Sequence, residues 1–501
     1  MVAIHLPLIL TAAAAQRHYS VIILGGGITG IIAARELHRG SISDFLIVDA
    51  QDSLGGRLRN VQVGGYTVEV GPNWIEGVHS DRGRTNPIYE LAQKHGLRMV
   101  YNNWTDVAFY DQHGRNTKEF PKSFARAVKQ KAVLVSSAGE RIARGKVDLT
   151  ARSGLRLSSQ NVAQSQYDKA SEYFTYDWEY GQRPDESSWI ATSLNYNGTF
   201  DPVYGFGDSD LMCIDQEDRI TSQTARLGFR KFIVKEAELF LQPPQILLNT
   251  IVKTIDYTDS GVSVFTRDGH KLTADHVLVT FSVGVLQYND VVFHPPLPYW
   301  KREAVLSMRM ATYTKIFLAF DRKWWDNSEM GLYADPHRRG YYPVWQSLDH
   351  ERFLPGSHIY FVTVTGDESE RIETMTDNEV KCEIMGVLRS MYPVVYIPEP
   401  TSIFFNRWFS DPLFRGSYSN WPASFYVEHM NNLRGSLAAT VHFAGEATSG
   451  DYYGYMHGAY YEGEARGKAI AKCIVHDDCS DIPVGKDFDE LNMKFTPSMT
   501  T

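Results

Sequence analysis

Cysteine is scarce in this sequence. Its 501 residues contain only four, and none lies in a C-x-x-C pair or beside histidines at a metal-ligand spacing. We therefore expect no metal site. Cys473 and Cys479 lie close enough in sequence to close a small disulfide loop near the C-terminus, whereas Cys213 and Cys382 have no partner that the sequence reveals.

Long apolar runs and excess positive charge are also missing. No segment beyond the first residues resembles a membrane span. The formal net charge of −9 argues against nucleic acid and anionic membranes as partners, and it is compatible with a cationic small molecule. No short-period repeat or low-complexity segment occurs, and the length predicts two or three domains.

Residues 1–16 resemble a secretory signal, because an apolar centre leads into an Ala-x-Ala end. They lack the usual Lys or Arg at the start, so a disordered N-terminus is the alternative. Two glycosylation sequons, at Asn103 and Asn197, agree with secretion but are common by chance. We expect a secreted protein, with a cytoplasmic one as the alternative.

The stretch Val21–Asp49 carries the strongest motif. An apolar run leads into Gly25, Gly27 and Gly30 in a G-x-G-x-x-G pattern, followed by a helical pattern and a second apolar run that ends at Asp49. The first glycine gives a tight turn, the second lets the backbone approach a pyrophosphate, and the third lets helix pack on strand. Asp49 is placed to accept hydrogen bonds from a ribose. This stretch predicts a dinucleotide-binding α/β domain.

The rest of the chain alternates between helical and strand-like patterns. Helices are predicted over 86–150, from 231, over 377–391 and from 455 to 473, with the many Lys and Arg of 120–155 on a solvated face. Strands are predicted over 245–255, 261–265, 275–281, 308–320 and 441–445. These strands return to the first domain after a long excursion.

With these motifs in hand, the chain resembles the flavin-containing amine oxidases, and among them the extracellular plant-type polyamine oxidases. The matching stretches are Gly25–Gly30, Gly55–Arg57, Asn73–Gly77, Tyr313–Leu318, Arg339–Gln346, Ser419–Pro422, Phe443–Glu446 and Gly454–Tyr460. The resemblance implies an α/β fold in which a Rossmann-like FAD-binding domain is interleaved with an α+β substrate-binding domain. We expect a signal peptide at 1–16, FAD segments at 17–96, 200–295 and 401–475, substrate segments at 97–199 and 296–400, and a flexible tail at 476–501.

The same resemblance implies the cofactor site. FAD would lie along a set of residues drawn from all three cofactor segments. The set is Gly25, Gly27, Gly30, Asp49, Gly56, Arg57, Trp74, Val252, Trp408, Glu446 and Tyr455. Monoamine oxidases carry a flavin thioether where this chain reads Ser449-Gly-Asp451-Tyr452, so FAD is expected to be non-covalent. Trp421 and Tyr455 are candidates to flank the flavin ring.

The resemblance also implies the reaction and its residues. Lys315 would hold a water at flavin N5, with Tyr313, Glu76 and Glu179 as further catalytic candidates. The residues Trp74, Glu76, Glu179, Tyr180, Tyr418 and Tyr455 would line a substrate tunnel. Polyamines such as spermine, spermidine or acetylated forms would lose a hydride to the flavin, and O2 would reoxidise it, giving hydrogen peroxide and an aminoaldehyde.

The residues themselves support parts of this chemistry. Lys315 shares one strand face with Tyr313 and Phe317, where a lysine is costly unless it is paired, hydrated or snorkelling to the surface. Two carboxylates beside aromatics, Glu76 and Glu179, suit a polycation, although a capping or surface acid is the alternative at each. His457 lies in a tight glycine and aromatic stretch and is read as a satisfied core histidine.

Other interpretations stay open. A monoamine oxidase, an L-amino-acid oxidase or a flavin-binding protein without turnover are the alternatives, although no arginine clamp for a substrate carboxylate is evident in the tunnel motifs. The residues do not decide which C–N bond is cleaved, and the resemblance favours the inner side. A monomer or weak oligomer is expected.

Overall fold

The computed structural model describes residues 17–79, 84–158, 163–197, 200, 211–214 and 228–486. The signal-like segment 1–16, the Gly-Thr of the second sequon and the tail beyond 486 lie outside the described residues. The predictions for these segments therefore stay predictions.

The first sheet contains the predicted dinucleotide strands. Its order is β10-β2-β1-β13-β12-β11-β14, with β22 added beside β13. The bounds are β1 (His18–Leu24), β2 (Phe45–Val48), β10 (Ile246–Leu247), β11 (Val252–Thr258), β12 (Gly261–Thr266), β13 (Lys271–Val279), β14 (Val292–His294) and β22 (Val441–Phe443). Strands β10, β2, β1, β13 and β22 run parallel, so their carboxyl ends meet at one edge. Three distant chain segments thus build this sheet.

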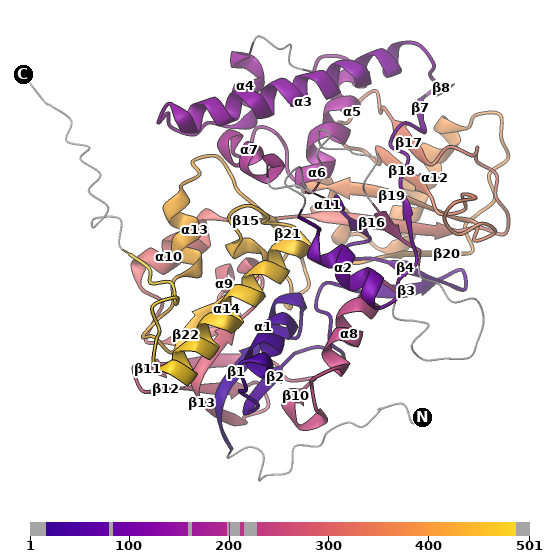
Figure 1. The fold of residues 1–501 in the computed structure, drawn as a ribbon. Helices are drawn as coiled ribbons and strands as arrows, with labels where there is room; N and C mark the ends of the chain where they lie inside the picture. The colour runs from indigo at the N-terminus through magenta and orange to yellow at the C-terminus, as the bar shows by residue number, and fades with distance from the viewer. Residues whose placement is uncertain are drawn as a thin grey trace, which may run out of the picture.

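Helices α1 (Ile28–Arg39) and α14 (Met456–His476) lie side by side over the first sheet, indigo beside yellow in Figure 1. Gly463 and Gly467 of α14 sit against the backbone of Thr29 and Ala33 in α1, where a Cβ would meet backbone atoms at 2.5 to 2.8 Å. The first and last of these helices, α1 and α14, therefore pack closely together.

The second sheet has the order β20-β16-β19-β18-β17-β7-β8. Its strands are β7 (Val107–Asp111), β8 (Gly114–Arg115), β16 (Tyr313–Ala319), β17 (Met330–Tyr333), β18 (Val344–Ser347), β19 (Ile359–Thr365) and β20 (Ser402–Phe405). Strand β16 alternates strictly: Ile316 and Leu318 face the core under α12 (Asp377–Met391), and Phe317 faces the opposite core. Strand β20 belongs to this sheet although it follows the expected boundary at 401.

The remaining elements connect and cover the two sheets. Three small sheets pair β3 (Asn60–Val63) with β4 (Tyr66–Glu69), β5 (Trp74–Ile75) with β9 (Leu211–Cys213) and β6 (Met99–Tyr101), and β15 (Arg309–Ala311) with β21 (Tyr418–Asn420). The other helices are α2 (Pro87–Lys94), α3 (Glu119–Ala143), α4 (Ala151–Leu157), α5 (Gln166–Glu172), α6 (Trp178–Tyr180), α7 (Trp189–Asn197), α8 (Lys231–Glu238), α9 (Val283–Gln287), α10 (Tyr299–Ser307), α11 (Gly366–Glu373) and α13 (Val427–Arg434). Short turns of other helix types are the π-helix η2 (Tyr173–Asp177) and the 3₁₀-helices η4 (Gly228–Arg230), η5 (Pro243–Gln245) and η6 (Glu446–Thr448).

The prediction of continuous helix over 86–150 is wrong between α2 and α3. That stretch contains β6, β7 and β8. Strand β7 runs parallel to β17, more than 200 residues later in the chain. The pairing that makes it a strand comes from a distant segment, which a local pattern does not reveal.

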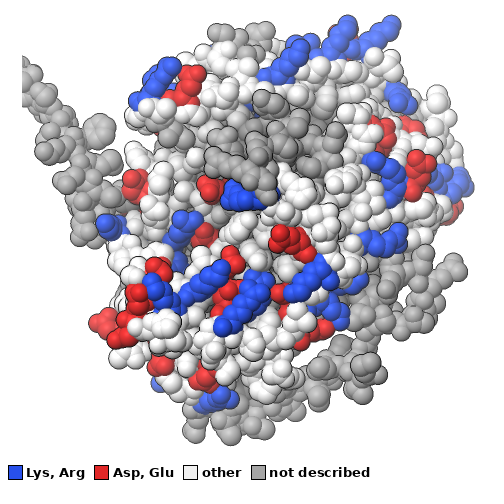
Figure 2. All heavy atoms as spheres, in the orientation of Figure 1, with Lys and Arg blue, Asp and Glu red and all other residues white. Residues whose placement is uncertain are grey.

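Helix α3 carries most of the predicted basic face, and its Lys and Arg side chains follow the upper edge of the molecule in Figure 2. Lys122 and Arg126 have side chains that are 66% and 57% exposed, as expected. Lys131 departs from the prediction, because it is buried and its Nζ lies 5.4 Å from the Tyr180 ring centroid. Lys131 of this basic helix therefore points into the protein rather than into solvent.

Two further sequence features can be checked. Cys473 and Cys479 form a disulfide, while Cys213 is buried and Cys382 is exposed without a bridge. Within the described residues, no helix is both long and apolar enough to cross a bilayer, and no cluster of three or more His, Cys, Asp or Glu could hold a metal ion.

Candidate functional site

One cavity of about 400 Å³ lies between the first sheet and the face of the second sheet that carries Lys315. The structure brings almost every predicted site residue into its wall. These are Gly25, Gly27, Asp49, Gly56, Arg57, Trp74, Glu76, Glu179, Tyr180, Val252, Tyr313, Lys315, Trp408, Tyr418, Glu446 and Tyr455. Gly30, which lies beneath the turn, and Trp421 are the exceptions.

The glycine turn follows β1 and opens α1. Gly25 has φ +118°, a backbone conformation that favours glycine, and a Cβ there would lie 2.3 Å from Thr280 Oγ1. A Cβ on Gly30 would lie 2.0 Å from the carbonyl oxygen of Gly25, so only glycine lets the helix approach this closely. At Gly27 the nearest atom to a Cβ is the Gly56 Cα at 3.9 Å. The turn is thus shaped for a group that approaches the backbone.

Asp49 stands at the end of β2, as predicted. Its Oδ2 accepts a hydrogen bond from the Gly26 amide at 2.6 Å, and its Oδ1 accepts one from the Gln51 amide at 2.7 Å. Burial raises the pKa of Asp49, and these two amide donors oppose the rise. The carboxylate therefore ties the glycine turn to the loop after β2 at the cavity wall.

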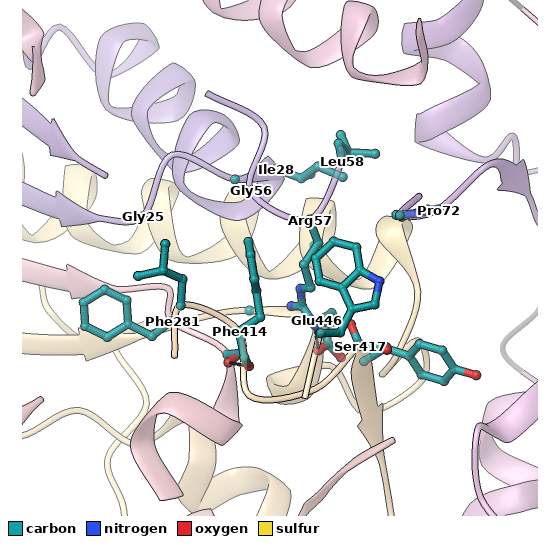
Figure 3. A pocket seen from close by; sticks show the side chains of 18 of the residues that line it. Gly25, Ile28, Gly56, Arg57, Leu58, Pro72, Phe281, Phe414, Ser417 and Glu446 are labelled. Atoms are coloured by element: carbon teal, nitrogen blue, oxygen red, sulfur yellow. Dashed lines mark hydrogen bonds and ion pairs between the residues drawn. The ribbon is translucent and has the colours of Figure 1, made fainter. Parts of the chain in front are cut away.

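Arg57 and Glu446 form an ion pair in the centre of the cavity wall (Figure 3). The Arg57 guanidinium donates to Glu446 Oε1 at 2.8 Å and to the Ser417 carbonyl at 3.0 Å. Glu446 also accepts from Ser419 Oγ and, at 2.8 Å, from the Gly454 amide. In Figure 3, Gly25, Ile28 and Gly56 lie on the side of the cavity opposite Phe281 and Phe414. The pair joins the first and last parts of the chain.

Val252 and Trp408 complete the cofactor candidates. Val252 opens β11 and lines the cavity with Asp49 and the loop that follows it. Trp408 follows β20 and packs edge-on against Phe414, with ring centroids 5.0 Å apart. Both are buried in the part of the wall built from the later segments.

Lys315 points from β16 into the cavity and is only 4% exposed, so it does not snorkel to the surface. Its Nζ donates to the carbonyl oxygens of Glu69 and Gly71, at 3.2 and 2.5 Å, and to Asn73 Oδ1. Burial lowers the pKa of Lys315 to about 7, while the nearby Glu69 and Glu76 oppose that fall. A lysine that gains or loses its proton near neutral pH suits proton exchange with a bound water.

The two predicted tunnel acids both line the cavity, from distant segments. Tyr455 donates from its hydroxyl to Glu179 Oε1 at 2.7 Å, and Tyr418 donates to the Glu179 carbonyl oxygen at 3.0 Å. Glu76 lies near enough to Lys315 to act on its charge. The acids and the lysine therefore share one cavity.

The cavity tyrosines are neutral donors. Burial raises the pKa of Tyr313, Tyr418 and Tyr455 well above the ordinary value, and the charges of Glu76 and Glu179 raise it further. These phenols stay protonated at any working pH. Tyr313, predicted among the catalytic residues, therefore lines the cavity as a protonated phenol, and its catalytic role stays a prediction.

Tryptophans form the wall around these groups. Trp74 lies edge-on to Trp178 at 5.7 Å, and Trp104 lies edge-on to Trp178 at 5.6 Å. The Trp74 indole donates to Asn102 Oδ1 at 2.8 Å, which fixes its ring, and Lys315 Nζ lies 5.2 Å from that ring. Aromatic rings therefore surround Lys315 in this part of the cavity wall.

Two interpretations from the sequence need correction. Trp421 does not line this cavity; it is buried in a separate core, 4.9 Å from the Phe425 ring and stacked on His429. His457 is buried as predicted but is not satisfied, since neither ring nitrogen has a hydrogen-bond partner among the described residues. Burial lowers the pKa of His457 to about 3, so it is a neutral ring stacked on Tyr455.

Several wall residues were not singled out from the sequence. They are Asn73, Trp104, Trp178, Phe281, Phe414 and Ser417. Trp178 stands beside Glu179 in the sequence, so the aromatic Asp-Trp-Glu-Tyr run carried a signal. Phe281, Phe414 and Ser417 come from loops with no pattern that marks a ligand site.

The fold and cavity define a class of protein. A parallel sheet with a glycine turn after β1, an acid after β2 and a second sheet that closes the cavity is the arrangement of a dinucleotide-binding oxidoreductase of the flavoenzyme type. The sequence model of the flavin containing amine oxidoreductases matches residues 28–470. The chain belongs to this family, and it is a flavin-dependent amine oxidoreductase.

Relatives and solved structures agree with this assignment. The chain is 35% identical to polyamine oxidase 6 of Oryza sativa subsp. japonica over 472 residues, which covers 92% of each chain. It is 34% identical to polyamine oxidase 1 of Zea mays over 478 residues, with 92% of this chain and 91% of that one covered. A solved structure of putrescine oxidase bound to putrescine has a TM-score of 0.70 at 16% identity and covers 91% of this chain and 99% of the other, which shows the same fold.

Proposed function

We propose that this protein oxidises polyamines with a non-covalently bound FAD. The observation that carries the proposal is one aromatic cavity that holds two carboxylates, Glu76 and Glu179, and a buried lysine, Lys315. The similarity to plant polyamine oxidases supports it. Spermine, spermidine or their acetylated forms are the proposed substrates.

The residues present fit FAD. Gly25 and Gly27 leave backbone open beside the N-terminus of α1, which favours a pyrophosphate, and Arg57 supplies a cation in the same wall. Among the described residues no cysteine lines the cavity, which supports non-covalent binding. Bound FAD would accept a hydride from the carbon beside a secondary amine nitrogen and pass the electrons to O2, giving hydrogen peroxide. Hydrolysis of the imine then gives the aminoaldehyde.

The chain's own residues would select and prepare the amine. Glu76 and Glu179, both half-buried in the cavity wall, attract the ammonium groups that do not react. A close charge pair of this kind contributes about 2–5 kcal/mol, roughly 30- to several-thousand-fold in affinity. The surrounding tryptophans and tyrosines disfavour a charge on the reacting nitrogen, because desolvation penalises the ammonium form. The neutral amine has the lone pair that hydride loss requires.

Lys315 is proposed to hold a water at the reacting end of the cavity. Its three hydrogen-bond acceptors all lie in the segment from Glu69 to Asn73, which fixes the position of Nζ. These acceptors occupy all three donors of the ammonium, so the water would be held by the neutral amine, whose lone pair can accept a hydrogen bond. Lys315→Met should slow the reduction or reoxidation of the flavin while leaving the bound flavin absorbance intact. Wild-type rates of both half-reactions in this variant would remove the role.

Peroxide release tests the substrate class. The purified protein should produce hydrogen peroxide with spermidine or spermine, and much less with benzylamine or leucine. Activity confined to a monoamine or an amino acid would reassign the subclass, and no bleaching of the flavin band under anaerobic substrate would make it a non-catalytic flavin protein. Glu76→Gln should raise KM for spermidine at least tenfold.

Secretion is proposed alongside this function. The disulfide between Cys473 and Cys479 supports it, because disulfides persist in oxidising compartments. Expression with residues 1–16 fused to a reporter protein should deliver the reporter to the medium. Retention of the reporter inside the cell would favour the cytoplasmic alternative.

A further inference from the structure

Glu179 reaches the cavity from an unusual piece of helix. Helix α5 does not run directly into α6; the five residues of η2 between them form a π-helix, in which each hydrogen bond spans one residue more than in an α-helix. Such a turn rotates everything after it. It therefore decides which way Trp178, Glu179 and Tyr180 point, and all three line the cavity.

An ion-pair network grips both ends of this π-turn. Arg339 binds Asp177, the last residue of η2, through two hydrogen bonds of 2.5 and 2.7 Å. The same guanidinium donates to Glu172, the residue before η2, at 2.9 Å. Arg152 completes the network with two hydrogen bonds to Glu172 at 2.5 and 2.7 Å. One guanidinium therefore ties together the two residues that bracket the turn.

The network is well shielded from solvent. The Asp177 side chain is 2% exposed and that of Arg339 is 22% exposed. Burial raises the pKa of Asp177, and Arg339 opposes the rise. Without Arg339, Asp177 would be a buried acid without its bidentate partner, and such an acid either takes up a proton or moves toward water. Either change loosens the last residue of the turn.

The residue after Arg339 fits the same turn. Gly340 has φ +82°, and a Cβ on it would lie 2.8 Å from the Tyr173 ring, so the chain can pass here only as glycine. Tyr173 is the first residue of η2, and its hydroxyl accepts from the Thr365 amide at 2.7 Å. Thr365 pairs with Tyr313 across β16 and β19. Tyr173 thus fastens the start of the turn to the strand beside β16, and Gly340 leaves room for its ring.

We propose that Arg339 is a positioning residue for substrate selection, which holds the π-turn in the shape that presents Glu179 and Trp178 to the cavity. The inference rests on the proposed function for the identity of the substrate. The placement of the turn itself is independent of it. No group of this network touches the cavity, so Arg339 acts through Asp177 rather than on the substrate.

The test compares Arg339→Met and Arg339→Lys with Arg371→Met. Arg371 is the matched control, since it binds Glu383 bidentately and Glu368 through one oxygen, away from the cavity. Binding of spermine is measured by calorimetry under anaerobic conditions on protein whose flavin has been reduced beforehand, so that no turnover occurs. The near-ultraviolet circular dichroism of Trp74, Trp104 and Trp178 and the melting temperature are measured alongside it. Arg339→Lys is expected not to restore spermine binding, because an ammonium cannot bind both carboxylate oxygens of Asp177 as the planar guanidinium does.

We expect Arg339→Met and Arg339→Lys to bind spermine at least about tenfold more weakly, a loss of about 1.4 kcal/mol, with an altered tryptophan dichroism. The turnover at saturation should change less than the KM. Arg371→Met should lower the melting temperature without either effect. Wild-type binding and dichroism in the Arg339 variants would overturn the proposal.

Asp177→Asn serves if Arg339→Met does not fold, since it keeps the shape of the side chain and removes only its charge. The same tenfold weakening is expected, and unchanged binding and dichroism would overturn the proposal. A wild-type protein that binds no polyamine would count against the proposed function instead. The dichroism comparison would still decide whether Arg339 holds the turn.

Discussion

Replacing Glu69 with glutamine tests how the buried charges behind Lys315 are balanced. Glu69 Oε1 accepts from the Phe229 amide at 2.7 Å, and its Oε2 has no hydrogen-bond partner among the described residues. Burial raises the pKa of Glu69 from 4.5 to about 7, although Phe229, Lys315, Arg230 and Asn60 all oppose the rise. The folded protein therefore keeps this carboxyl largely neutral below pH 7.

The sign of the effect on stability follows directly. Folded Glu69 holds a proton up to about pH 7, whereas the unfolded chain releases it near 4.5. The stabilisation from this proton is complete below pH 4.5 and is lost as the pH rises through 7. Glutamine is neutral at every pH, so Glu69→Gln should match the wild type in acid and become more stable than it as the pH rises.

The size of the gain can be worked out. The difference between about 7 and 4.5, at 1.36 kcal/mol per pH unit, corresponds to about 3 kcal/mol. An unfolding entropy of about 2.1 cal/mol/K per residue over 501 residues gives about 1 kcal/mol per degree. About 2 kcal/mol of this difference develops between pH 5 and pH 7, so the melting temperature of Glu69→Gln relative to the wild type should rise by about 2 °C over that range.

Thermal melts of both proteins at fixed scan rate, from pH 5 to 7, provide the assay. Lys315 has a pKa of about 7 and begins to lose its proton only near the upper end of this range. Glu383→Gln is the control: the pKa of Glu383 lies below its usual range, with Arg371 and Tyr342 as partners, so its loss should give an offset that does not vary with pH. A flat or falling difference for Glu69→Gln would show that Glu69 is ionised in the fold, and the reasoning would fail.

Three further changes have clear expected outcomes. Gly30→Ala should weaken FAD binding at least tenfold, as read from the flavin-to-protein absorbance ratio. The control Gly139→Ala should leave that ratio unchanged, because a Cβ at Gly139 meets nothing within 4 Å. Cys473→Ser opens a loop of six residues and should cost about 2 kcal/mol, or about 2 °C in melting temperature; an unchanged melt under oxidising conditions would contradict this. Lys131→Met removes a buried cation whose field reaches Glu179, and spermine affinity should rise several-fold by calorimetry, so weaker binding would refute that role.

The cofactor half of the site was predictable because its signals are local. Gly25, Gly27 and Asp49 lie within one strand-turn-helix-strand unit, and the first two directly contact the space they were expected to shape. Lys315 was also predictable, since the period-two pattern of β16 places it on one face with Tyr313 and Phe317. In both cases the pattern that marks the residue is local, although the hydrogen-bond acceptors of Lys315 come from the distant segment Glu69–Asn73.

Predictions failed where the environment is supplied by distant segments. Strand β7 looked helical because its partner β17 lies far along the chain. Lys131 looked solvated because the helix around it is amphipathic and basic, yet Tyr180 covers it. Trp421 shares a motif with Ser419, which binds Glu446 at the cavity. Trp421 lies two residues further along, just after a short strand, and its side chain points into another core. A motif fixes the backbone path better than it fixes which side of that path a ring occupies.

Glu179 shows the same limit in its sharpest form. An α-helix turns about 100° per residue, and a π-turn adds one residue to one turn. An α-helix continued without interruption from Gln166 would therefore point Glu179 about 100° away from its direction after the π-turn. Helical periodicity in the sequence therefore points to the wrong face for this acid. The π-turn that redirects Glu179 is held at its ends by Glu172 and Asp177. Both acids bind Arg339, a residue more than 150 positions later. The site's selectivity is thus encoded in two places, the acid that meets the substrate and the distant arginine that turns it.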